Sequence, residues 1–212
     1  MTKGKFITFE GGEGAGKSTQ VKLLIDAFAN ADLSAYPTRE PGGTKGAESI
    51  RNLLVNGDVS KWSAKTETLL HLAARNDHVE KTIKPKLDAG VNVICDRFMD
   101  STISYQGYGH GLGLDYVTDL QKIIIEDLAP DLTFIFDISV ENGLARTSNR
   151  GNTENRYEKM ARNFHENVRN GFLEIAKNNP DRCYIINADD DIRNIHLNII
   201  EIIQERLKIN LC

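Results

Sequence analysis

Hydrophobic and polar positions follow two different periods along this chain. Five short runs rich in β-branched and aromatic residues are predicted strands, at 5–10, 33–39, 92–97, 132–138 and 183–188. Several of them are apolar on both faces, as expected of strands that lie between two layers of helices. Between these runs, apolar residues recur every three or four positions, which predicts helices. One predicted helix spans 17–31. Two further apolar stripes consist of Tyr157, Met160, Phe164, Val168 and Phe172, and of Ile192, Ile195, Ile199 and Ile202.

Strands that alternate with helices predict an α/β fold of three layers. The expected architecture is a five-stranded parallel sheet with helices on both faces. In such folds ligands bind at the carboxyl ends of the strands. We therefore expect functional residues where the predicted strands end.

Composition places the chain among soluble globular proteins of one domain, which we expect to span 1–212. Hydrophobic residues make up 40% of the chain, charged residues 26%, and the net charge of -4 argues against a protein that coats nucleic acid. Three cysteines with no close pair fit a reducing compartment. The segment MTKGKFITFE lacks the apolar run of a signal peptide, and no stretch approaches a membrane span. We expect a cytoplasmic protein without nucleic-acid or membrane partners.

A phosphate-binding loop follows the first predicted strand and opens the first predicted helix. Residues 11–18, GGEGAGKS, match the spacing G-x-x-x-x-G-K-[ST]. The glycines let backbone N–H groups converge on phosphate oxygens, and the helix N-terminus adds the positive end of its dipole. Lys17 is expected to reach the β- and γ-phosphates, and the Ser18 hydroxyl to ligate Mg²⁺. The predicted ATP-binding residues are Gly11, Gly12, Glu13, Gly14, Ala15, Gly16, Lys17, Ser18 and Thr19. The loop and the α/β pattern together predict the P-loop NTPase fold.

Three large classes of protein share this loop. GTPases read guanine with an N-K-x-D segment, which is absent from this chain. Mechanochemical ATPases are longer and usually end a strand with Asp-Glu, whereas here the strands end with CDRF and FD. Small-molecule kinases remain, and the length of the chain suits them.

Five segments in order resemble bacterial thymidylate kinase: FITFEGGEGAGKST, TREPGGT, ICDRF, DSTISYQGYG and PDLTFIFD. The resemblance runs through essentially the whole chain. It implies an enzyme that transfers the γ-phosphoryl group of ATP to dTMP, giving dTDP and ADP for dTTP synthesis. It also implies Mg²⁺ as a cofactor and, as is usual in that family, a homodimer.

The acceptor in that reaction is a phosphate that is already ionised near neutral pH. No general base is needed, so catalysis consists of positioning two anions and neutralising their charge. By the resemblance, Arg97 binds the acceptor phosphate, and Asp96 orients it or holds Mg²⁺ through water, beside Ser18. Arg39 and Arg51 are expected as further phosphate contacts.

The resemblance also assigns residues to the base and the sugar of the acceptor. Arg75 matches the position that donates to thymine O4, which disfavours cytosine. Thr102 and Gln106 match positions near the base edge, and Tyr105 matches the tyrosine under the sugar C2′. His71 stands where the family commonly has a phenylalanine that stacks on the base. Its imidazole is smaller, and we expect it to gain a proton at about pH 6 to 7.

The phosphate loop lacks an arginine, which directs attention to a lid at about 146–156, RTSNRGNTENR. Arg146 and Arg150 are spaced so that they share a helix face. Arg156 lies just beyond, and Gly151 suits a flexible segment. This pattern looks like the lid-arginine type of the family, with Arg146 and Arg150 as catalytic residues alongside Lys17 and Arg97.

A carboxylate inside a loop that binds anions requires an explanation. Because alternate side chains of the loop point outward, Glu13 is expected to face the acceptor. By the resemblance, it accepts a hydrogen bond from the acceptor's 3′-hydroxyl.

Two alternatives stay open at this point. The chain is another deoxynucleotide or deoxynucleoside kinase, or it is a nucleotide-binding switch without transfer activity. Phosphorylation of a sugar hydroxyl would need a general base, for which Glu40 or Glu13 are candidates. The acceptor arginines argue against a nucleoside, which offers them no charge to bind.

Overall fold

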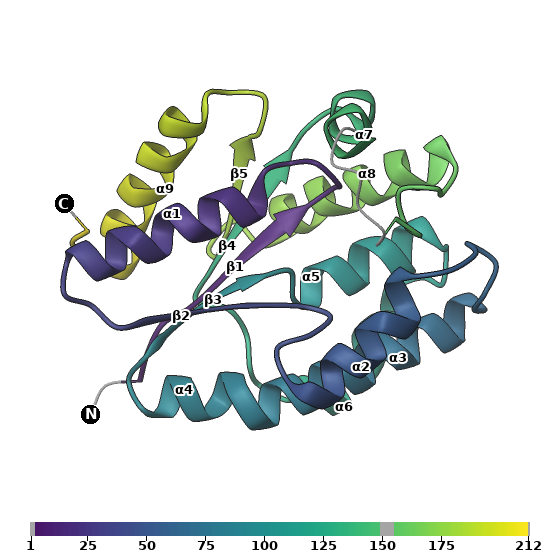
Figure 1. Ribbon diagram of the computed structural model, residues 1–212, viewed down its shortest axis with the longest axis horizontal. Helices are drawn as coiled ribbons and strands as arrows, with labels where there is room; N and C mark the ends of the chain where they lie inside the picture. The colour runs from purple at the N-terminus through teal and green to yellow at the C-terminus, as the bar shows by residue number, and fades with distance from the viewer. Residues whose placement is uncertain (1–2, 149–154, 212) are drawn as a thin grey trace.

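The computed structural model describes residues 3–148 and 155–211 of the chain. In these ranges it contains one five-stranded sheet with the order β2-β3-β1-β4-β5, and all four strand pairs are parallel (Figure 1). The strands are β1 (Phe6–Gly11), β2 (Ala35–Arg39), β3 (Asn92–Asp96), β4 (Leu132–Asp137) and β5 (Cys183–Asn187). The predicted parallel five-stranded sheet is confirmed. The largest difference at a strand end is that β2 begins at Ala35 and not at residue 33.

Helices cover both faces of this sheet. They are α1 (Lys17–Asn30), α2 (Lys45–Val55), α3 (Ala64–His78), α4 (Lys84–Asp88), α5 (Met99–Thr102), α6 (Leu114–Ile125), α7 (Val140–Ser148), α8 (Arg162–Asn178) and α9 (Ile192–Leu207). Two π-helical segments, η1 (Val79–Ile83) and η2 (Ile103–Gly109), continue α3 and α5. Among the described residues, no helix combines the length and the apolar character needed to cross a membrane.

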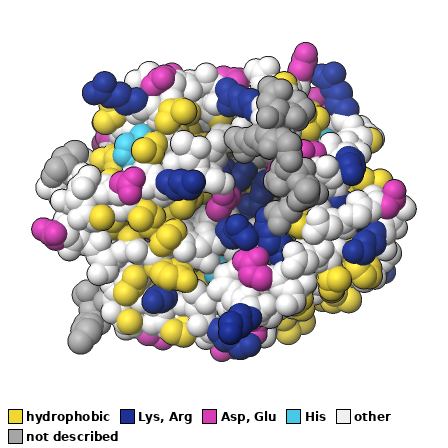
Figure 2. Space-filling model, in the orientation of Figure 1, with side chains coloured by type: hydrophobic (Ala, Val, Ile, Leu, Met, Phe, Trp, Pro, Cys, Tyr) yellow, Lys and Arg dark blue, Asp and Glu magenta, His cyan; other side chains and the backbone are white. Residues whose placement is uncertain are grey.

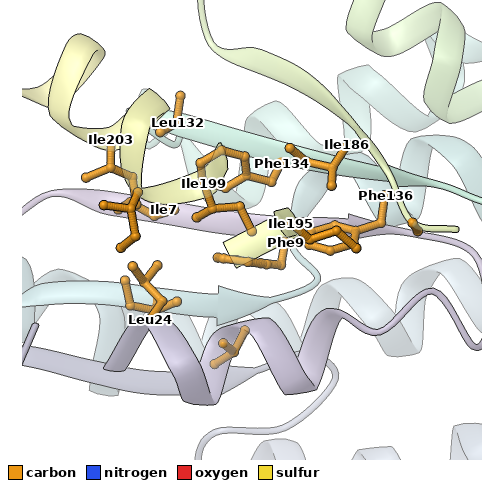
Figure 3. Packing of buried hydrophobic residues seen from close by; sticks show 14 of the residues in the cluster. Ile7, Phe9, Leu24, Leu132, Phe134, Phe136, Ile186, Ile195, Ile199 and Ile203 are labelled. Atoms are coloured by element: carbon orange, nitrogen blue, oxygen red, sulfur yellow. The ribbon is translucent and has the colours of Figure 1, made fainter. Parts of the chain in front are cut away.

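The first core lies between the sheet and the pair of helices α1 and α9. Alternate residues of β1, Ile7 and Phe9, face this layer together with Phe134 and Phe136 of β4 (Figure 3). Leu24 of α1 and the α9 residues Ile195, Ile199 and Ile203 cover them from outside, whereas Ile192, the first member of the predicted stripe, is exposed. The periodicity of the last helix therefore reflects burial against the sheet.

The opposite face carries two further clusters. Phe6, Val93 and Phe98 pack there against Ile83 of η1 and Ile125 of α6. Beside them, Phe164, Val168 and Phe172 of α8 pack against residues of β4, β5 and η2. The predicted stripe that began at Tyr157 is wrong in its first two members, because Tyr157 and Met160 lie in a turn before α8 begins. Both side chains still pack against the cluster, which explains their apolar spacing.

The topology brings three strand ends side by side. Because β3 lies between β2 and β1, the residues that follow these strands meet at one edge of the sheet. The phosphate loop follows β1, Arg97 follows β3 and Glu40 follows β2. Arg97 adopts the left-handed backbone conformation with φ of 70°, so the chain turns sharply into α5 at this point.

Candidate active site

A cavity of about 360 Å³ opens at the carboxyl ends of the strands. Lysine and arginine side chains gather in the hollow at the centre of the face shown in Figure 2. Among the predicted site residues that the structure describes, all except Gly11, Gly12 and Arg146 line this cleft. The structure therefore joins the phosphate loop and the predicted acceptor residues in one space.

The phosphate loop is packed tightly against α7. Gly14 has φ of 69°, and a Cβ atom built on it would lie 2.1 Å from the carbonyl oxygen of Gly143. No side chain fits there, so glycine is required both for the conformation and for the contact. Gly16, with φ of 88°, is the N-cap of α1, and the helix begins at Lys17.

The Lys17 ammonium is held inside the loop that it serves. Its Nζ donates to the carbonyl oxygens of Gly11 at 3.1 Å and of Gly12 at 2.7 Å. Burial, followed by the charge of Arg97, lowers the pKa of Lys17 to about 8. A bound polyphosphate would add negative charge and favour the protonated form.

Ser18 and Asp96 place two oxygen ligands together at the mouth of the loop. The Ser18 hydroxyl donates to Asp96 Oδ2 at 2.6 Å. Hard divalent cations such as Mg²⁺ take oxygen ligands, often one or two from the protein and the others from phosphates and water. The two residues suit such an ion, and the magnesium site stays a prediction.

Arg97 connects the two halves of the cleft. Its guanidinium donates to Gly11 O at 2.9 Å and to Glu13 Oε1 at 3.1 Å, and it lies over the Tyr105 ring. The Tyr105 hydroxyl donates to the same Glu13 oxygen at 2.7 Å. Although burial alone would raise the pKa of Glu13, the charges of Arg97 and Lys17 hold it below its usual value. Glu13 is therefore ionised and points away from the loop interior, toward Arg97 and Tyr105.

A buried acid that we did not predict, Glu10, supports the turn at Arg97. Its carboxylate accepts from the Phe98 N–H at 2.8 Å and from Ser101 Oγ at 2.5 Å, while Arg97 donates to the same Ser101 oxygen at 3.3 Å. Burial and the nearby Asp100 charge raise the pKa of Glu10 to about 7. The available signal was a single charged residue near the end of a strand whose other residues are uncharged.

Arg75 is buried and makes many contacts. Its guanidinium donates to Glu40 at 2.7 Å, to Thr102 at 2.9 Å, to Gln121 at 2.6 Å and to the Phe98 carbonyl at 2.8 Å. Glu40 also contacts His78 Nδ1 at 3.0 Å. Glu40 is thus engaged by two cationic or donor groups, which contradicts its candidacy as a general base for a sugar hydroxyl. Nothing in the local sequence pointed to Gln121.

His71 differs from expectation in its charge. Its Nε2 hydrogen-bonds the Tyr157 hydroxyl at 2.7 Å. Burial in the cleft wall lowers the pKa of His71 to about 4. The expected titration at about pH 6 to 7 is therefore wrong for this state, and the imidazole is neutral near pH 7.

Comparison with known proteins agrees with this geometry. The sequence model described as thymidylate kinase matches residues 9–199. The chain belongs to the thymidylate kinase family. It is 47% identical to the thymidylate kinase of Caulobacter vibrioides over 98% of this chain and 99% of that protein, and 44% identical to that of Afipia carboxidovorans over 97% and 91%. The crystal structure of thymidylate kinase from Ehrlichia chaffeensis superposes with a TM-score of 0.76 at 38% identity, covering 95% of this chain and 99% of that one.

Membership of the thymidylate kinase family confirms the P-loop NTPase fold and the predicted class of enzyme, a dTMP kinase with ATP as phosphoryl donor. The roles of individual residues stay predictions. So does the lid-arginine type.

The predicted thymidylate kinase lid is only partly described. Arg150 lies outside the described residues. Arg146 donates to the Ala188 carbonyl at 2.9 Å and pairs with Asp189 at 3.2 Å, outside the cleft. Arg156 is fully buried and donates to the carbonyls of Asp58 at 3.0 Å and Val59 at 2.9 Å, so it is a structural anchor and not a lid arginine in this state.

Arg39 and Arg51 line the cleft near its opening. Arg39 is exposed and pairs with Glu48 at 3.2 Å. Arg51 donates to the Pro41 carbonyl at 2.9 Å. Both side chains lie where an anionic acceptor in the cleft would attract them.

Proposed function

We propose that the cleft binds ATP at the phosphate loop and dTMP at Arg97, and that the chain transfers the γ-phosphoryl group between them. The observation that carries this proposal is the contact of Arg97 with the Gly11 carbonyl at 2.9 Å, because it joins the acceptor arginine to the donor loop. An acceptor phosphate on Arg97 and a γ-phosphate on Lys17 would then be neighbours. The products are dTDP and ADP.

The reaction needs no base from the protein. An oxygen of the dTMP phosphate attacks the γ-phosphorus, and the bond to the β,γ-bridging oxygen breaks with its electron pair leaving on ADP. Arg97 neutralises the attacking phosphate and Lys17 the transferred group. Positioning and charge neutralisation are the protein's contribution.

Mg²⁺ is the cation that we assign to the Ser18 and Asp96 oxygens. When bound, the ion would supply positive charge that offsets the negative charge of the ATP phosphates. Ser18 would ligate it directly, and Asp96 would hold it directly or through a bound water. Chelation by EDTA should therefore abolish ADP formation, and added Mg²⁺ should restore it.

The acceptor nucleoside would occupy the side of the cleft formed by α3, α5 and η2. Arg75 and Thr102 lie at the base edge, and the neutral His71 offers a flat ring for the base. Tyr105, buried against Tyr157 and Phe172, fills the space beside the sugar C2′. Glu13, held between Arg97 and Tyr105, would accept from the 3′-hydroxyl.

We further propose that the enzyme is a homodimer through α3 and α6. These helices pack together, and Lys65 of α3 lies over the Tyr116 ring of α6. Leu69, one turn beyond Lys65, is 55% exposed, and Ile123 of α6 is 74% exposed. Large apolar side chains gathered on one face indicate a protein interface.

The experiment is a coupled ADP-release assay with ATP and Mg²⁺. The acceptors are dTMP, dUMP, dCMP, AMP and thymidine, each over a range of concentrations. We expect the highest kcat/KM with dTMP. A preference for thymidine would instead establish a deoxynucleoside kinase, and ATP consumption independent of every acceptor would remove the transferase assignment.

A further inference from the structure

Glu67 of α3 is a fully buried acid at the centre of a polar cluster below the acceptor cleft. Its Oε1 accepts hydrogen bonds from the amide Nε2 of Gln106 at 2.9 Å and from the ring Nε2 of His110 at 2.9 Å. Its Oε2 lies 2.5 Å from the guanidinium of Arg156. The phosphoryl transfer described above assigns no task to this carboxylate, and an acid without exposure is costly unless its partners need it.

Glu67 is ionised in this environment. Burial alone would raise its pKa, but the hydrogen bond from His110 and the positive charge of Arg156 are among the causes that bring the pKa to about 2. An ionised carboxylate only accepts hydrogen bonds. Every group that contacts Glu67 must therefore present a donor.

This requirement decides which way the Gln106 amide points. The end that faces Glu67 must be the NH₂ group, so the carbonyl oxygen is the end that remains for a ligand. Gln106 is buried in η2 and lines the cleft. A glutamine amide is otherwise free to present either end, because its oxygen and nitrogen have nearly the same shape.

Arg75 supplies the complementary donor. Within the described residues, four of its N–H groups donate to Glu40, Thr102, Gln121 and the Phe98 carbonyl. The fifth N–H group, on Nη2, is then available to donate to a ligand. The cleft wall thus offers an N–H from Arg75 and a carbonyl oxygen from Gln106. Thymine presents an acceptor, O4, beside a donor, N3–H. Cytosine presents the reverse order, an amino donor beside an unprotonated N3.

We propose that Glu67 is a positioning residue for base selection. Its hydrogen bond with the Gln106 NH₂ group holds the Gln106 carbonyl oxygen toward the cleft. The pocket then favours a base with a protonated N3. The proposal rests on the function proposed above and on the predicted place of Gln106 near the base edge. Glu67 touches neither the nucleotide nor the reacting atoms and acts through Gln106.

The test is Glu67→Gln, which replaces an obligate acceptor by an amide that can present either end. The Gln106 amide is then free to turn and offer its NH₂ group to the base. We expect the ratio of kcat/KM for dTMP to that for dCMP to fall about tenfold, the scale of one lost polar match. The loss should lie mainly in a higher KM for dTMP, with kcat at saturating dTMP and ATP nearly unchanged.

A matched control separates selection from a general disturbance of the cluster. His110→Phe also removes a donor to Glu67, but it leaves the Gln106 contact intact, so it should keep the wild-type ratio. Gln106→Leu should lower the ratio, and adding Glu67→Gln to it should lower it no further, since both changes act on one contact. If Glu67→Gln lowers the ratio of kcat/KM values by the same factor with and without Gln106→Leu, the proposal is overturned.

Glu67→Gln leaves Arg156 without its counter-charge, and this variant is at risk of not folding. The same ratio is then measured in Glu67→Gln combined with Arg156→Met, which removes both buried charges. A folded variant of either kind with the wild-type ratio overturns the role of Glu67. Failure of the wild-type chain to phosphorylate dTMP would instead overturn the proposed function, so the two failures are distinct.

Discussion

At the scale of single residues, the cleft contains acidic groups where anions must bind, and two of these acids accept hydrogen bonds from an arginine or a hydroxyl group. Glu13 lies against Arg97, and Asp96 lies against the Ser18 hydroxyl. The acids hold the cations and donors in place before the nucleotides arrive. Substrate phosphates can then take over contacts that already exist, with little reorganisation.

Lys17 is the residue whose loss should cost the most activity. Its ammonium lies within hydrogen-bonding distance of two loop carbonyls and would follow the γ-phosphoryl group as charge shifts. We expect Lys17→Ala to lower kcat about 10³-fold with the fold intact. Steady-state assays and circular dichroism check both parts. Near-normal turnover in a folded variant would remove the phosphate-loop assignment.

Glu13 should affect the acceptor through its 3′-hydroxyl. We expect Glu13→Ala to lower kcat/KM for dTMP by about 10- to 100-fold, the range of a hydrogen bond to a charged group. Wild type with 3′-deoxy-TMP should show a similar loss, and the variant with 3′-deoxy-TMP little more. If Glu13→Ala impairs both acceptors equally, its role lies instead in holding Arg97 and Tyr105.

His71 should make the stability of the fold depend on pH. Its pKa is about 4 when folded and about 6.5 when unfolded, so the unfolded chain binds more protons between these values and acid favours unfolding. This contribution is present above about pH 6.5 and is lost as the pH falls toward 4. The groups that face the ring are Glu67, Arg75, Glu40, Arg156 and Tyr157.

We expect His71→Phe to lose less stability than wild type between about pH 7 and about pH 5, because Phe cannot gain a proton. Urea unfolding at both values measures the difference. The remaining histidines are the same in both proteins, so their contributions to the pH dependence of stability cancel in the comparison. Parallel pH profiles would mean that His71 is solvated and not desolvated in the cleft wall.

At the scale of elements, α7 contacts both the phosphate loop and the loop that follows β5. Gly143 of α7 is in close contact with Gly14 of the loop, and Arg146 reaches from the same helix to the loop after β5. A shift of α7 would therefore move Arg146 relative to the phosphates. We take this as the route by which the predicted lid arginine could enter the cleft.

If Arg146 stabilises the transferred phosphoryl group, Arg146→Ala should lower kcat more than it raises KM for ATP. We expect a loss in kcat of about 100-fold or more. Arg193→Ala, an exposed arginine of α9, is the control and should retain wild-type kinetics. A wild-type kcat in Arg146→Ala would leave the lid role to Arg150 or to no lid residue.

At the scale of the whole molecule, α3 contributes both to the charged cleft and to the apolar face that we propose as the dimer interface. Arg75 and Glu67 point from α3 into the cleft and the cluster below it, while Leu69 is exposed. A partner on that face would therefore support the helix that positions the base-reading residues. Dimerisation and substrate binding would be linked through α3.

We expect the wild-type protein to sediment at twice the mass of the 23.7 kDa chain. Ile123→Glu places a charge in the proposed interface and should shift the protein toward the monomer. Leu197→Glu on α9, also an exposed apolar position, should not. Analytical ultracentrifugation distinguishes the two variants. A monomeric wild type, or equal behaviour of both variants, would place the interface elsewhere or nowhere.

The amino-acid sequence by itself determined the features that depend on neighbours along the chain. The strands follow from short apolar runs, α1 and α9 from their periods, and the phosphate loop from fixed spacing of glycine, lysine and serine. Local geometry is enough to predict these, because backbone conformation and side-chain direction repeat over a few residues. The order of the motifs along the chain was then enough to indicate the family.

Only the tertiary structure decided which charged groups meet. Arg156 looked like a lid residue, but it is buried against the loop between α2 and α3. His71 looked titratable near neutral pH, and its surroundings make it neutral. Glu67 had no local signal, since Gln106, His110 and Arg156 are far away in sequence. Charge state and hydrogen-bond direction depend on burial and on partners brought together by packing, and no local pattern specifies either.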